Sequence, residues 1–137
     1  MGRETLALRL DEARAILVAA LTGLGERDFS ADAGGITVTN LLADLAMAEH
    51  EAIRQARSAA GLPARPAVTA GGATSRPLPP QVTHALAGTR YEARALLEAL
   101  GEQLGEAPVP AGVTSALLDG LATREIEAAA RIAARTA

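Results

Sequence analysis

Residues Gly35 to Glu51, GITVTNLLADLAMAEHE, contain the signals of a helix with a defined start and a core-facing side. Thr37 is placed to cap this helix, and Ile36 before it can pack on Leu41 in a hydrophobic staple. Leucines then recur at helical spacing, with Asp44 set among them. Because burying an unpaired carboxylate is costly, we expect Asp44 to meet a partner between helices.

The same periodicity continues on both sides of this stretch and predicts a single all-α domain over residues 1–137, a four-helix bundle. Val113 and Thr114 repeat the staple and cap of the opening stretch. Phe29 is expected to anchor a polar connection. A proline-rich segment over residues 61–80 cannot continue a helix and predicts a long crossover between the second and third helices. The expected helices span residues 3–24, 37–60, 80–104 and 114–135.

Composition excludes several classes of function. The chain has no cysteine and no lysine, which removes thiolate ligands, disulfides and lysine Schiff bases. Its net charge is −3 and its arginines are scattered, so we expect no nucleic-acid partner. No apolar run reaches the roughly 20 residues that span a bilayer, and the first residues do not form a signal peptide. We therefore expect a cytoplasmic protein with no membrane partner.

The histidines and most other charged residues are interpreted as solvated. His50 stands between Glu49 and Glu51, but adjacent helical residues point in different directions and cannot converge on one ion. His84 is expected at the surface, where loop closure could bring it to a cleft. The remaining residues interpreted as solvated helix faces are Glu125, Glu127 and Arg131 on the last helix and Arg90, Arg94 and Glu98 on the third.

Asp44 has two possible roles. It could be a metal ligand or acid–base group between helices, or it could pair with an arginine of a neighbouring helix. Leu117, Leu121, Arg124 and Ala128 share one stripe of the last helix. If that stripe faces inward, Arg124 is a natural counter-charge. We therefore predict an Asp44–Arg124 ion pair.

Two segments resemble the DinB/YfiT-like superfamily. Residues 36–46, ITVTNLLADLA, with Glu49 following, resemble its second helix, in which a Trp and a Ser or Thr cap precede Val-x-x-Leu-Leu-x-His-Leu. Residues 117–132 resemble its last helix, in which two histidines four residues apart precede an apolar residue. This resemblance implies a dimeric four-helix bundle in up-down-down-up order. It also implies a divalent metal held by three histidines and, in some members, a thiol-dependent transferase or isomerase activity.

The residues carried over from the resemblance depart from its metal site. The three histidine positions fall on Asp44, Arg124 and Ala128, and the tryptophan position falls on Ile36. An arginine repels a metal ion and an alanine offers no ligand, so the usual triad is missing. We expect no cofactor and no catalytic residue at these positions.

Three functions follow as hypotheses. The first is a non-catalytic bundle that binds a small ligand or acts as a structural homodimer. The alternative is a metal-dependent thiol S-transferase or isomerase that binds nickel or zinc through an altered set, such as Asp44, His50 and Glu125 or Glu127. A third is an interaction module that uses the proline-rich segment as a docking strand.

Overall fold

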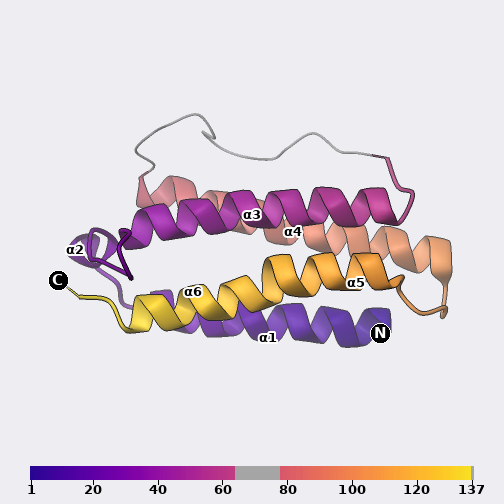
Figure 1. Cartoon of the computed structure of the whole chain (residues 1–137), viewed down its shortest axis with the longest axis horizontal. Helices are drawn as coiled ribbons and strands as arrows, with labels where there is room; N and C mark the ends of the chain where they lie inside the picture. Colours follow the sequence, from indigo (N-terminus) through magenta and orange to yellow (C-terminus); the bar gives the residue numbers. More distant parts are fainter. Residues whose placement is uncertain (64–77, 137) are drawn as a thin grey trace.

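The computed structural model describes residues 1–63 and 78–136, and in these residues the chain is helical throughout, apart from turns and two isolated bridges. Four long helical stretches lie side by side, and a short helix precedes the second of them (Figure 1). The prediction of an all-helical fold is confirmed. The elements are α1 (Arg3–Leu21), α2 (Glu26–Phe29), α3 (Val38–Ala59), α4 (Pro79–Leu104), α5 (Ala111–Leu117), the π-helical turn η1 (Leu118–Ala122) and α6 (Thr123–Ala133).

The long stretches run in two directions. The side chain of Gln103 near the end of α4 donates to the Ala60 carbonyl at the end of α3, over 3.1 Å, so these two helices end together. The Val109 N–H, just before α5, donates to the Met1 carbonyl over 3.1 Å. The stretch α5–η1–α6 therefore starts where α1 starts, and both run opposite to α3 and α4 (Figure 1).

The predicted start of the second helix is confirmed. The Thr37 hydroxyl accepts a hydrogen bond of 3.2 Å from the Asn40 N–H, which satisfies one of the free donors of the first turn. Phe29 packs against the apolar core as expected. The first helix ends at Leu21 rather than near Leu24, because Gly23 has a φ of +81° and turns the chain away.

The predicted cap of the last helix is wrong. This helix begins at Ala111, and Thr114 lies inside its first turn. The Pro110 carbonyl accepts from the Val113 and Thr114 N–H groups over 3.1 and 3.0 Å, so the helix forms from the proline onward. The predicted crossover falls mostly on residues 64–77, which lie outside the described residues.

The last helical stretch contains one extra residue in the π-helical turn η1. At about 100° per residue, Glu125 in a regular α-helix would point about 120° away from Val113. The extra residue changes the direction of the side chains that follow it by about 100°, which removes most of this difference. Val113, Leu117, Leu121 and Glu125 therefore all face inward.

At Gly120, in this π-turn, the last stretch lies very close to α3. A Cβ atom built on Gly120 would lie 2.1 Å from the Ala52 Cβ, so an alanine there forces the two backbones apart. Gly112, the second residue of α5, offers a matched comparison, because its added Cβ would meet the Ala59 Cβ at an ordinary 3.6 Å.

We predict that Gly120→Ala lowers the free energy of unfolding by about 1–3 kcal/mol through overpacking. Gly112→Ala should be neutral or stabilising by up to about 1 kcal/mol, because alanine is the better helix former. Urea denaturation followed by circular dichroism measures both. Equal effects of the two substitutions would contradict the close approach at Gly120.

Candidate binding cavity and buried polar layer

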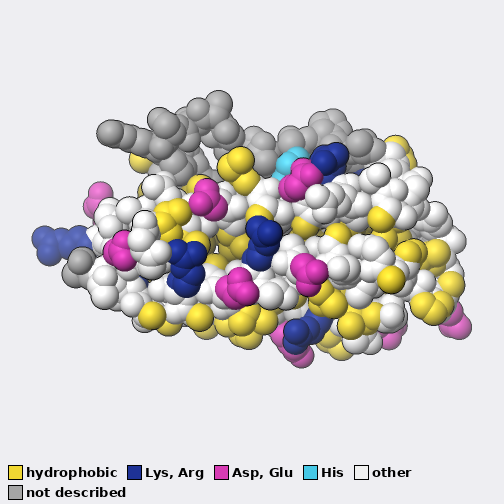
Figure 2. All heavy atoms as spheres, viewed as in Figure 1, with side chains coloured by type: hydrophobic (Ala, Val, Ile, Leu, Met, Phe, Trp, Pro, Cys, Tyr) yellow, Lys and Arg dark blue, Asp and Glu magenta, His cyan; other side chains and the backbone are white. Residues whose placement is uncertain are grey.

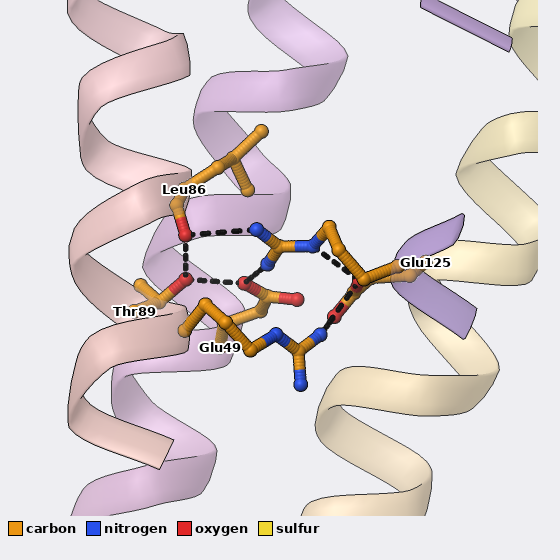
Figure 3. Close-up of polar contacts among 6 residues, drawn as sticks. Glu49, Leu86, Thr89 and Glu125 are labelled. Atoms are coloured by element: carbon orange, nitrogen blue, oxygen red, sulfur yellow. Dashed lines mark hydrogen bonds and ion pairs between the residues drawn. The ribbon is translucent and has the colours of Figure 1, made fainter. Parts of the chain in front are cut away.

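A layer of polar side chains crosses the middle of the core. It separates an apolar cluster around Leu6 and Leu100 from another around Leu17 and Ile132. Each long helical stretch contributes to it, and the two carboxylates are completely buried (Figure 3). The layer consists of Arg14 from α1, Glu49 from α3, Thr89 and Arg90 from α4, and Glu125 from α6.

Glu125 is held by two arginines from different helices. Its Oε1 accepts from Arg14 Nε over 2.7 Å, and its Oε2 accepts from Arg90 Nη2 over 2.6 Å. Burial alone would raise the pKa of Glu125. Its interactions with Glu49, Arg14 and Arg90 outweigh this effect and hold the pKa below its ordinary value. Glu125 is therefore ionised and is the main counter-charge of the layer.

Glu49 is in a different electrostatic state. Its Oε1 accepts from Arg14 Nη2 over 3.2 Å and lies 2.5 Å from the Thr89 hydroxyl, while its Oε2 has no partner among the described residues. Burial raises the pKa of Glu49 well above its ordinary value, and the neighbouring Glu125 carboxyl raises it further. The positive charge of Arg14 acts in the opposite direction but does not compensate.

The contacts of Thr89 agree with a protonated Glu49. The hydroxyl lies within hydrogen-bond distance of both the Glu49 carboxyl and the Leu86 carbonyl, at 2.5 and 2.9 Å, yet it carries a single proton. If Glu49 is protonated, it donates to Thr89, and Thr89 donates to Leu86. Both contacts are then satisfied.

The interpretation of Glu49, Arg90 and Glu125 as solvated residues is wrong. Glu49 and Arg90 each lie three or four residues from buried apolar residues on both sides, so they occupy core positions of their helices. That spacing is visible in the sequence and is the signal that could have identified them. For Glu125 the signal is hidden, because the π-turn changes the inward face.

An open cavity of about 450 Å³ lies between α3, α6 and the turn at residues 34–36. Charged side chains surround a hydrophobic hollow on this face of the molecule (Figure 2). Asp44, Arg124 and Ala128, from the two segments that resemble the DinB/YfiT-like superfamily, all line it, together with Glu127. A second cavity of about 420 Å³ adjoins the first one and shares Arg124 with it.

The wall formed by the turn is attached to α6 by Arg131. Its Nε donates to the Ala33 carbonyl over 2.9 Å and its Nη2 to the Gly34 carbonyl over 3.0 Å. Gly34 and Gly35 have φ values of +83° and +89°, which favour glycine and let the backbone turn tightly here. Glu127 and Arg131, which stand four residues apart on α6, do not form an ion pair, because the arginine binds these carbonyls instead.

Asp44 is exposed rather than buried, so its predicted core position is wrong. The neighbouring leucines, Leu41, Leu42 and Leu45, occupy the inward face and leave Asp44 at its edge. Arg124 is exposed too, because the π-turn brings Glu125 inward in its place. Within residues 1–63 and 78–136, no ion pair joins Asp44 to Arg124, although both line the same cavity.

The other candidate residues do not gather into a site. His50 is half-buried on α3 and His84 is exposed on α4, and neither lines these two cavities. Glu125 lies in the polar layer. In the part of the chain that the structure covers, no three His, Cys, Asp or Glu side chains are grouped so that they could hold a metal ion. Among these residues, no helix is long and apolar enough to cross a membrane.

Comparisons of the chain with known protein families, with curated proteins and with solved structures found no match.

We predict that Glu125→Gln lowers the free energy of unfolding by about 3–5 kcal/mol, because it leaves the buried guanidinium of Arg90 and the partly buried one of Arg14 without their counter-charge. Glu127→Gln, on the exposed face of the same helix, should change it by less than about 0.5 kcal/mol. Chemical denaturation measures both values. A small effect of Glu125→Gln would mean that the layer is not an ionic network.

We predict that Glu49→Gln changes how stability depends on pH. Glutamate in the unfolded chain ionises near its ordinary pKa of 4.5, whereas folded Glu49 keeps its proton to higher pH. Its contribution to the free energy of unfolding therefore falls as the pH rises from 4.5 to the raised pKa, by at most about 1.4 kcal/mol per pH unit.

Glutamine stays neutral, so the Glu49→Gln variant should gain stability relative to the wild type as the pH rises above about 5. Glu125, whose pKa is lowered, contributes in the opposite direction and only as the pH falls below 4.5. Urea denaturation of both proteins over this range tests the sign. Parallel curves would show that Glu49 is ionised in the folded state.

Proposed function

We propose that this chain is a binding protein that holds a small organic molecule in the cavity between α3 and α6, and that it is a DinB/YfiT-like bundle without the metal site. One observation carries the proposal. Asp44, Arg124 and Ala128, assigned to the metal site from resemblance alone, lie around one cavity. The cavity also has the size of small-molecule sites, which are about 300–1,000 Å³.

The directions of the helices support the same family. In the order α1, α3, α4 and α5–η1–α6, the second and third stretches run together and opposite to the first and last (Figure 1). These directions support the up-down-down-up order that the resemblance implies. The homodimer that it also implies stays a prediction.

Binding is favoured over catalysis by where the unusual electrostatics lie. Strongly perturbed pKa values are typical of acid–base catalysts. The carboxyl with the strongly raised pKa, Glu49, belongs to the buried layer, and neither it nor its partner Glu125 lines the cavity. The charged groups at the cavity are exposed, as expected for side chains that orient a ligand.

The donor set does not fit the metal that the resemblance implies. At the three positions, only Asp44 could bind a cation, since a guanidinium repels one and a methyl group has no lone pair. The altered set with His50 fits no better, because His50 does not line the cavity. We therefore propose a function that does not involve metal.

We predict that small organic molecules shift the amide resonances of Gly34, Gly35 and residues around Asp44 and Arg124 in ¹⁵N NMR spectra of the protein. Ala48 lines both cavities, so Ala48→Leu should weaken this binding by filling the space they share, while the melting temperature reports on folding. Shifts confined to other surfaces, or their absence across a broad library, would contradict the proposal.

Measuring the metal content of the protein tests the alternative, metal-dependent function. The protein is dialysed against nickel or zinc, and bound metal is determined by elemental analysis for the wild type, Asp44→Ala and the exposed control Asp11→Ala. We expect no stoichiometric metal in any of them. About one ion per chain that is lost only in Asp44→Ala would overturn the metal-free function.

A further inference from the structure

We propose, on the basis of the function above, that the ligand is a small aliphatic zwitterion: a molecule with one ammonium group, one carboxylate and a short apolar body, such as a free aliphatic amino acid. The inference concerns the chemical class of the ligand. It rests on the charges at the cavity between α3 and α6 and on how few of them are already paired.

Three charged side chains at this cavity are available to a ligand. Asp44, Arg124 and Glu127 are exposed, and in the described part of the chain none of them makes a side-chain hydrogen bond or an ion pair. Arg131, the fourth charged residue of the cavity, is occupied by the carbonyls of the turn. The cavity therefore presents two carboxylates and two guanidinium groups, and of the two arginines only Arg124 has all its donors free; among the described residues neither carboxylate is paired with either arginine.

Opposite charges in one cavity select for a ligand that carries both. A purely anionic molecule drawn to Arg124 would be repelled by Asp44 and Glu127, and a purely cationic molecule would be repelled by Arg124. A zwitterion gains from both signs, because its carboxylate can accept from the guanidinium while its ammonium donates to a carboxylate.

The remaining wall fits an apolar body. Ile36, Leu41, Leu45 and Ala128 line the same cavity, and the volume of about 450 Å³ leaves room for an amino acid with an aliphatic side chain. The exposed charges at the hollow and the hydrophobic surface within it (Figure 2) would then bind opposite ends of one molecule.

The test compares four probes that share a branched carbon skeleton. They are L-leucine, 4-methylpentanoate without the ammonium group, 3-methylbutylamine without the carboxylate, and uncharged 3-methyl-1-butanol. Each is titrated into the full-length ¹⁵N-labelled protein. We expect leucine to shift the amides around Gly34 and Arg124 and to bind at least about tenfold more tightly than any other probe, the gain typical of one charge-assisted hydrogen bond.

Substitutions identify the groups that recognise each charge. Arg124→Gln should reduce leucine binding to the level of 3-methylbutylamine, and Asp44→Asn combined with Glu127→Gln should reduce it to the level of 4-methylpentanoate. Arg94→Gln on α4 and Asp11→Asn on α1 are exposed controls outside the cavity and should leave leucine binding unchanged. Unaltered melting temperatures would show that every variant is folded.

The outcomes separate the ligand class from the function itself. The zwitterion inference is overturned if a single-charge or uncharged probe binds as tightly as leucine. It is also overturned if leucine fails to bind while another probe binds. In both cases binding at the cavity stands. If neither these probes nor a broad library shifts the resonances of the cavity, the proposed function is overturned as well.

Discussion

The pairing of Glu125 with Arg14 and Arg90 is the interaction on which the rest of the structure depends. It joins α1, α4 and α6 in the middle of the core. Glu49 connects α3 to this layer by accepting a hydrogen bond from Arg14. Buried charges are tolerated only when each has a partner. Sliding any helix by one turn would separate these charges, whereas the apolar clusters on either side could repack. The layer therefore sets the axial register that positions α3 against α6 at the cavity.

The sequence predicted the helical class and most helix boundaries, because those depend on local signals. Thr37 capped its helix as expected, and the leucine stripe of α3 packed inward. The polar layer was missed for a physical reason. Glu49 and Arg90 have the spacing of core positions, but that spacing does not show whether a charge there finds a partner, because the partners lie 35–111 residues away in the sequence. Asp44 drew attention as the acid among leucines, while Glu49 was the buried one.

The candidate site was predicted in part. Asp44, Arg124 and Ala128 lie at one cavity, as a shared site requires, but the ion pair between the first two is absent from the described structure. Periodicity places residues on a face of a helix but does not give the distance across a cleft. Within a few turns of α3 and α6, the charged residues therefore fall into two groups. The paired charges of the layer hold the helices together, and the unpaired charges of Asp44 and Arg124 remain exposed at the cavity.

The π-turn has a consequence for how such a protein can change. Glu125 and Arg124 are neighbours in sequence, yet the extra residue within Leu118–Ala122 decides which of them enters the core. Loss of that residue would rotate α6 by about 100° and exchange its faces. In evolutionary terms, one deleted codon could bring the exposed face of α6 into the core, or expose its buried face, without altering any side chain of α6. The number of residues in this helix therefore determines which side chains face the core, as much as the identity of those residues does.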